Sequence, residues 1–201
     1  MKELEADPRA KALIFDLDGT LLDSMPIHYE AWEEICRVKL DYDFTEEFFY
    51  NHAGVSSERI FEEVRRLSGI NFDPLLFARE KEALYETMLD KLTLIQPTIN
   101  IVKKYHGKLP MSIGTGSPRD GSWKAVKCMG LDKYFDILVS KEDVPHPKPA
   151  PDTFLRCAEI MGADPAVCQV FEDGDPGLKA ARTAGMIATD IRPFLNGKSK
   201  D

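Results

Sequence analysis

The 201-residue sequence has no apolar run near the roughly 20 residues that a helix needs to cross a membrane. Its first residues, MKELEADPRAK, also lack the apolar stretch of a signal peptide, so we expect a cytoplasmic protein with no membrane partner. None of its four cysteines stands in a Cys-x-x-Cys pair. We therefore interpret them as ordinary buried thiols and expect neither a disulfide framework nor a cysteine metal site.

The sequence also lacks an excess of positive charge. It has 26 Lys and Arg against 34 Asp and Glu, which gives a formal net charge of −8. Without a basic stripe to displace counterions from a phosphate backbone, nucleic acid is not expected as a partner. An anionic small molecule would need cations gathered at one place in the fold.

Short apolar runs alternate with helical patterns along most of the chain. Buried strands are predicted at residues 11–15, 111–115, 137–139, 168–171 and 186–191. Helices are predicted between them, at 97–105, 123–129, 152–161 and 176–184, the last with Asp175 as its N-cap residue. This alternation predicts an α/β fold, with a Rossmann-like parallel sheet covered on both faces.

Residues 26–92 interrupt this alternation with consecutive helical patterns and no strand. The patterns start at Pro26, Thr45, Ser56 and Pro74, with apolar residues at helical spacing. We expect two domains: an α/β core from residues 1–25 and 93–201, and a small helical cap inserted at 26–92.

The first predicted strand runs directly into two carboxylates, Asp16 and Asp18, within the pentad Asp-x-Asp-Gly-Thr. Ligands bind at the carboxyl ends of parallel strands, so both acids are candidates for a site. An EF-hand calcium loop starting at Asp16 is excluded, because Leu21 stands where that loop requires glycine. A solvated acidic turn would be the better explanation of a lone Asp-x-Asp, but the complete pentad is rare by chance and favours a site.

Three further stretches carry chemistry, two of them at predicted strand ends and one in a Pro-rich loop. Thr115 and Gly116 offer a hydroxyl and main-chain N–H groups as an anion seat, although no Walker A or dinucleotide fingerprint is present. Lys148 stands among prolines that restrict its backbone. Glu172 and Asp173 follow the strand at 168–171.

Together these stretches describe phosphoryl transfer. Asp16, Asp18 and Asp173 at adjacent strand ends would repel one another unless a cation lay among them. A set of oxygen ligands with room for water favours Mg²⁺. Thr115 and Lys148 then supply a hydroxyl and a positive charge for the phosphoryl group.

In this order, the four stretches resemble the motifs of the haloacid dehalogenase (HAD) superfamily. The resemblance extends from Lys11 to Pro193, and the helical insertion is similar to a small C1-type cap. The stretches DGTLLDSMPIHYEAW, KPAPDTF and FEDGDPGLKAARTAGM resemble the C1-capped sugar-phosphate subgroup, which includes β-phosphoglucomutase and bacterial fructose-1-phosphate phosphatases.

The resemblance implies roles for the acids. Asp16 would be the nucleophile that takes the phosphoryl group as an acyl phosphate, and Asp18 would protonate the leaving oxygen and then activate water. Mg²⁺ would be held by Asp16, Asp173, Glu172 and the main-chain carbonyl of Asp18.

The resemblance also implies the ligand contacts. Thr115, Gly116 and Lys148 would bind the phosphate, and His28, on the first cap helix, would bind the sugar phosphate. Ser117 and Arg119, in the loop after the second motif, are further candidates for substrate binding.

Departures from the mutase pattern favour hydrolysis. The mutases hold a second phosphate with cationic residues where this chain has Ala53 and Ser57, and with Lys-Asn where it has Pro118-Arg119. We therefore predict a monomeric, Mg²⁺-dependent phosphatase for a small hexose monophosphate such as fructose 1-phosphate. β-Phosphoglucomutase is the enzyme alternative. A phospho-receiver module is less favoured, because it needs neither Asp18 nor an inserted lid.

Overall fold

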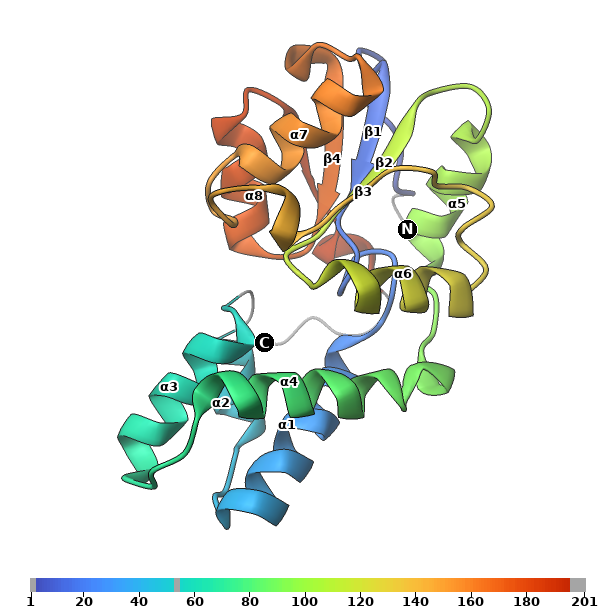
Figure 1. Ribbon diagram of the computed structural model, residues 1–201. Helices are drawn as coiled ribbons and strands as arrows, with labels where there is room; N and C mark the ends of the chain where they lie inside the picture. Colours follow the sequence, from blue (N-terminus) through green and yellow to red (C-terminus); the bar gives the residue numbers. More distant parts are fainter. Residues whose placement is uncertain (1–2, 53–54, 196–201) are drawn as a thin grey trace. The chain divides into compact units, whose positions relative to one another are not determined.

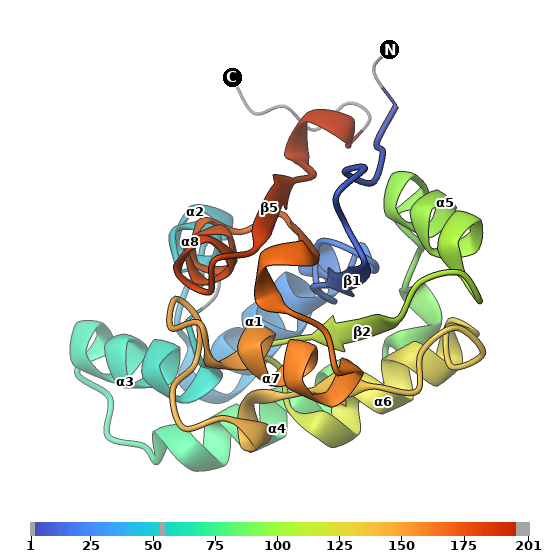
Figure 2. The ribbon, with the colours of Figure 1, turned by 90° about the horizontal axis from the view of Figure 1, so that it is seen from above.

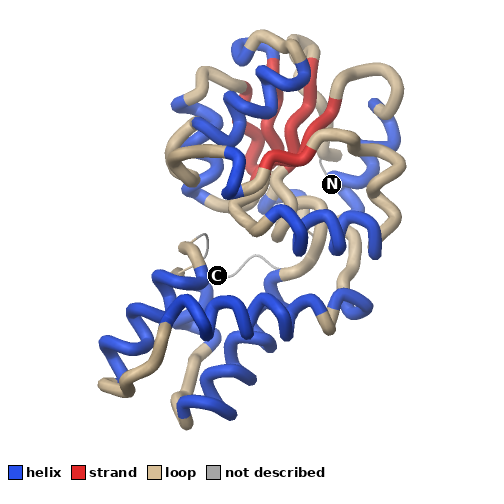
Figure 3. The backbone as a smooth tube through the Cα atoms, viewed as in Figure 1, coloured by secondary structure: helices blue, strands red, loops and turns tan. Residues whose placement is uncertain are grey.

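The computed structural model describes residues 3–52 and 55–195. The chain divides into two compact units, Met1–Asp23 with Thr93–Asp201, and Ser24–Leu92. Among the described residues, the strands all belong to the first unit and the second is built from helices (Figure 3). No described helix is both long enough and apolar enough to cross a membrane.

Five parallel strands form the sheet of the first unit, in the order β3-β2-β1-β4-β5 (Figure 1). They are β1 (Ala12–Phe15), β2 (Met111–Gly114), β3 (Leu138–Val139), β4 (Cys168–Glu172) and β5 (Ile187–Asp190). Strands β1, β2 and β4 are buried throughout, as expected for a parallel sheet covered on both faces. The predicted α/β fold is confirmed.

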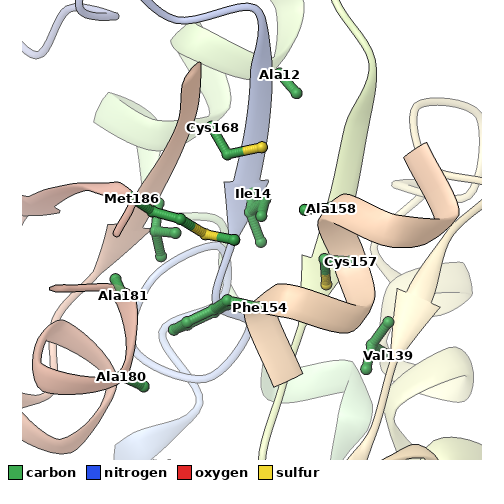
Figure 4. Packing of buried hydrophobic residues seen from close by; sticks show 11 residues of the cluster. Ala12, Ile14, Val139, Phe154, Cys157, Ala158, Cys168, Ala180, Ala181 and Met186 are labelled. Carbon is green, nitrogen blue, oxygen red and sulfur yellow. The ribbon is translucent and has the colours of Figure 1, made fainter. Parts of the chain in front are cut away.

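Helices cover both faces of this sheet. Helices α7 (Asp152–Met161) and α8 (Asp175–Thr183) lie on one side, and α5 (Gln96–Tyr105) lies on the other (Figures 1 and 2). Figure 4 shows the apolar cluster under α7 and α8, where Phe154 and Cys157 pack among side chains of the strands. Helical spacing places both residues on the buried face of α7.

The strand register brings the chemistry-bearing stretches together. Phe15 pairs with Ile113 of β2 on one side and with Phe171 of β4 on the other. The rings of Phe15 and Phe171 stack with centroids 4.9 Å apart. Because the strands are parallel and in this register, the residues that follow Phe15 emerge beside those that follow Phe171. From β1 the sheet continues to β2 on one side and to β4 on the other, so the strand order changes direction at β1. Open α/β sheets bind ligands at the carboxyl ends of the strands where this change occurs.

Two local predictions were wrong. Gly174 is the N-cap of α8, so Asp175 is the first helical residue, and its carboxylate pairs with Arg192 at 2.9 Å. Helix α6 spans Arg119–Cys128 and so begins four residues before its predicted start. The main-chain N–H of Arg119 is capped by the Glu142 carboxylate at 3.0 Å. A partner so distant in sequence leaves no local signal.

The second unit consists of the helices α1 (Met25–Leu40), α2 (Glu46–Asn51), α3 (Ser57–Ser68) and α4 (Pro74–Glu86). Thr45 and Asp73 cap α2 and α4 by accepting main-chain N–H groups. An aromatic core joins the helices: the Trp32 ring stacks on Phe44 with centroids 5.2 Å apart and meets the tilted ring of Phe61 at 4.3 Å.

A buried polar cluster lies within this helical unit. The Lys81 side chain is only 3% exposed, and its Nζ lies 2.8 Å from Nδ1 of His28 and 3.3 Å from Oε1 of Glu82. Glu82 also accepts the hydroxyl of Ser57 at 2.7 Å. Although burial raises the pKa of Glu82, the Lys81 charge and the Ser57 hydrogen bond outweigh it, so the net pKa is lowered. Glu82 therefore depends on Lys81 for its charge compensation.

Replacing Lys81 by Met is expected to reduce the free energy of unfolding by about 2–3 kcal/mol, because the Glu82 carboxylate loses its buried cation. Denaturant unfolding near pH 7 measures the loss. Lys91→Met is the matched control, since Lys91 pairs with Glu30 at 2.5 Å with both side chains about half exposed. Its loss should stay below about 1 kcal/mol. Equal losses in the two variants would contradict a specific role for the buried pair.

Candidate active site

Three carboxylates meet at the carboxyl ends of two neighbouring strands. Asp16 directly follows β1, Glu172 ends β4, and Asp173 comes next. One carboxylate oxygen from each lies within 4.8 Å of the others. We call Asp16, Glu172 and Asp173 the carboxylate cluster. The structure thus brings Asp16 together with two neighbouring acids that lie more than a hundred positions later in the sequence.

Lys148 lies against this cluster from the loop before α7. Its Nζ is 2.6 Å from Oδ1 of Asp16 and 2.8 Å from Oε2 of Glu172, and its side chain is only 11% exposed. Burial lowers the pKa of Lys148, but the two carboxylates outweigh burial and raise the pKa above its usual value. The side chain is therefore an ammonium ion, held directly beside Asp16.

Lys148 alone cannot balance the charge of three ionised carboxylates. Burial, and then repulsion from Glu172, raises the pKa of Asp16 well above its usual value and that of Asp173 to about 7. With all three carboxylates ionised against one ammonium ion, the net charge is −2. A divalent cation would offset that charge, and carboxylate oxygens are the ligands that Mg²⁺ prefers. The donor set therefore fits Mg²⁺.

Glu172 is fixed by the start of α8. Its Oε1 accepts the main-chain N–H of Gly174 at 2.9 Å and that of Asp173 at 3.2 Å. A Cβ at position 177 would collide with its carboxylate, so Gly177 is what lets this side chain lie over the first turn of the helix. The N–H groups and dipole of that turn favour a negative charge. Glu172 consequently presents its other oxygen to Lys148 in a fixed position.

Asp173 is held by the turn that follows β1. Its Oδ1 accepts the hydroxyl of Thr20 at 2.8 Å. Gly19 has φ of +86°, and a Cβ there would collide with the Asp173 carboxylate. Within the Asp-x-Asp-Gly-Thr pentad, the glycine thus leaves room for the Asp173 carboxylate and the threonine donates a hydrogen bond to it. The sequence predicted no role for Thr20, although its place in the pentad was the signal.

Asp18 faces the loop that follows β2. Its Oδ2 accepts the hydroxyl of Ser117 at 2.6 Å, and the main-chain N–H of Ser117 donates to Oγ1 of the buried Thr115 at 3.0 Å. Gly116 lies between them, and a Cβ there would meet no atom within 4 Å. The predicted phosphate-binding residues Thr115 and Gly116 therefore belong to the loop that contacts Asp18.

The remaining candidates have partners of their own. The Arg119 guanidinium pairs with Asp143. His28 lies on α1 in the helical unit, where its ring stacks on Tyr85 with centroids 3.9 Å apart and its Nδ1 meets Lys81. Substrate binding by Ser117, Arg119 and His28 stays a prediction.

Comparison with known proteins places the chain in one family. The sequence profile of the haloacid dehalogenase-like hydrolases matches residues 10–185. The fructose-1-phosphate phosphatase YqaB of Escherichia coli is 44% identical over 186 residues, which cover 92% of this chain and 97% of that protein. The β-phosphoglucomutase of Bacillus subtilis is 28% identical, over 90% of this chain and 83% of the mutase.

The fold is shared with solved structures of the same kind. A HAD hydrolase of family IA, variant 3, from Entamoeba histolytica superposes with a TM-score of 0.81 at 28% identity, covering 92% of this chain and 86% of that one. The predicted enzyme class is confirmed. From its profile match and its identity to a phosphatase along nearly the whole length, the chain belongs to the haloacid dehalogenase-like hydrolases and is a phosphoric monoester hydrolase.

Proposed function

We propose that this protein is a Mg²⁺-dependent phosphatase that hydrolyses a small hexose monophosphate, such as fructose 1-phosphate, through a phosphoaspartate at Asp16. The observation that carries this proposal is the carboxylate cluster with Lys148 bonded to two of its members. The substrate class is supported by the 44% identity to a fructose-1-phosphate phosphatase.

Two carboxyl groups divide the chemistry. A carboxylate oxygen of Asp16 bonds to phosphorus while the bond from phosphorus to the sugar oxygen breaks, and Asp18 gives its proton to that oxygen. Water then attacks the phosphoryl group, Asp18 takes a proton from the water, and inorganic phosphate leaves with Asp16 regenerated. Lys148, and the loop of Thr115 and Gly116, bind phosphoryl oxygens during both steps.

The metal site is proposed at the same strand ends. Asp16, Asp173, Glu172 and the main-chain carbonyl of Asp18 would hold Mg²⁺, which would offset negative charge on the phosphoryl oxygens when bound. Thr20 and Gly19 position Asp173 for this role, and the start of α8 positions Glu172.

The helical unit serves in this scheme as the cap predicted at residues 26–92, with the core at 1–25 and 93–201. Its compactness at Ser24–Leu92 supports this division. Hydrolysis is favoured over phosphoglucomutase activity because Ser57, which replaces a mutase cation, donates to the half-buried Glu82. Ala53, the other replaced position, lies outside the described residues.

The test is a screen of phosphate release across hexose and pentose monophosphates, with Mg²⁺ and with excess chelator. We expect fructose 1-phosphate to be among the preferred substrates and chelator to abolish release. A parallel assay supplies β-glucose 1-phosphate with glucose 1,6-bisphosphate and follows glucose 6-phosphate. Formation of glucose 6-phosphate faster than free phosphate would favour the mutase. Hydrolysis that persists in excess chelator would contradict the proposed requirement for Mg²⁺.

Asp18→Asn tests the proton donor. Without an acidic proton on residue 18, loss of kcat should reach about 100-fold or more for a sugar phosphate, whose alkoxide leaves poorly. For 4-nitrophenyl phosphate, whose phenolate leaves without protonation, the loss in the first step should be much smaller. Single-turnover rates with the two substrates measure this difference. Equal losses for both leaving groups would contradict the role of Asp18 as the acid.

A further inference from the structure

Three polar donors stand directly after Thr115, at residues 117 to 119, and each has an acidic partner within the protein. The Ser117 hydroxyl donates to Asp18 at 2.6 Å, the main-chain N–H of Arg119 donates to Glu142 at 3.0 Å, and the Arg119 guanidinium pairs with Asp143. Pro118, between them, has no N–H to offer. The first main-chain N–H of α6, at the end of the helix that favours anions, is thus capped by a carboxylate of the chain itself.

The Asp143 carboxylate is held in place independently of Arg119, and Glu142 precedes it in the same short turn. Asp143 accepts the main-chain N–H of the buried Ser140 at 2.8 Å and its hydroxyl at 2.7 Å. These bonds build the short turn Lys141–Asp143 that follows β3. The main-chain N–H of Lys141 in turn donates to the carbonyl of Ser117 at 3.4 Å. Main-chain and capping hydrogen bonds therefore place the two acids of this turn, Glu142 and Asp143, beside the loop after β2.

This loop lies on the side of the reaction where the sugar leaves. Ser117 contacts Asp18, which in the proposed function protonates the leaving sugar oxygen. A substrate with a second phosphate would need donors and positive charge beyond that oxygen. At residues 117 to 119 it would have to displace an internal carboxylate from each donor, and the negative charges of Glu142 and Asp143 would then remain beside it without their Arg119 partners.

We propose that Glu142 and Asp143 are specificity-determining residues that select sugar monophosphates and reject sugar bisphosphates. They act by holding the donors of Arg119 and by repelling a second phosphate, and this role rests on the proposed phosphatase function. Because Glu142 and Asp143 already occupy these donors, the loop would not retain a sugar bisphosphate, and the sugar product would be released.

The experiment compares kcat/KM for fructose 1-phosphate and fructose 1,6-bisphosphate, which differ by one phosphate. The double variant Glu142→Gln/Asp143→Asn keeps the side-chain shapes, and its amide oxygens still accept the capping bonds. The ratio of bisphosphate to monophosphate kcat/KM should rise by about tenfold or more, which is the effect of gaining one charge-assisted hydrogen bond. Asp164→Asn is the matched control, because Asp164 caps a short turn before β4, at the opposite end of the strands. Its ratio should equal that of the wild type.

The outcomes separate the two proposals. An unchanged ratio in a folded double variant, or a wild-type enzyme that already prefers the bisphosphate, overturns the selectivity role while leaving the phosphatase function intact. If the wild type hydrolyses neither sugar, the proposed fructose 1-phosphate activity fails. Calorimetric titration of both sugars into the Mg²⁺-loaded proteins then decides selectivity, with a Kd ratio that shifts by about tenfold as the expected result. If the double variant does not fold, the exposed Glu142→Gln alone must shift the ratio in the same direction.

Discussion

Replacing Asp16 by Asn is expected to reduce steady-state phosphate release by about ten-thousandfold or more, the scale seen when a nucleophile is removed from a catalytic unit. The carboxamide is a poor nucleophile, so no phosphoenzyme forms. Its oxygen can still accept the Lys148 bond, so the loss is chemical. Acid quenching with labelled substrate should trap phosphate on the peptide containing Asp16 in the wild type and none in the variant.

Although the Asp16→Asn variant loses activity, its thermal stability should equal or exceed that of the wild type. Burial and repulsion from Glu172 raise the pKa of Asp16, so its ionised form costs stability at neutral pH. A neutral Asn removes that cost, and without added metal the melting temperature should match or exceed that of the wild type. Asp175→Asn is the control, since Asp175 is 82% exposed and pairs only at the surface with Arg192. Its turnover should stay near wild type. Turnover of Asp16→Asn above that of a mock preparation would remove Asp16 as the nucleophile.

The strands and the carboxylate cluster could be predicted because their signals are local. Buried parallel strands are short apolar runs in the sequence, and acidic residues directly after such runs indicate a site at the strand ends. Parallel topology then requires the ends of β1 and β4 to lie together, so Asp16 and Asp173 meet once the strand order is known. The pairing of Phe15 with Phe171 shows which residues of β1 and β4 lie level with each other, and the sequence alone could not predict this register.

Other features depend on partners distant in sequence. The early start of α6 follows from Glu142, which reaches the main-chain N–H of Arg119 from another element. Lys81 lies on the buried face of α4 at helical spacing with Ala78 and Tyr85, which was a usable signal. Its partner His28 on α1 could not be identified before the helices were packed.

Replacing Lys148 by Met is expected to affect both activity and stability strongly. Met has a similar length and can keep the contact with the Phe154 ring, which lies 4.6 Å from Nζ of Lys148. The variant leaves Asp16 and Glu172 buried without their shared cation. Removal of one partner from such a buried pair costs about 3–5 kcal/mol in free energy of unfolding. Phosphate release should fall as well, because a charged contact to the phosphoryl oxygens is lost.

The pH and metal dependence of this loss distinguishes lost charge from lost packing. Because the folded-state pKa of Lys148 is raised, its stabilisation is fully present below the unfolded pKa and disappears only as pH rises through the folded value. In the variant, loss of the Lys148 charge raises the pKa of Asp16 further, so Asp16 takes up a proton more readily as pH falls, and the stability gap to the wild type should narrow towards acid pH. Added Mg²⁺ should stabilise Lys148→Met more than the wild type, since it would compensate the same carboxylates. Lys179→Met, at an exposed position of α8, should show neither effect. A gap that is constant with pH and indifferent to Mg²⁺ would mean that Lys148 contributes by packing, and the electrostatic account of the carboxylate cluster would be wrong.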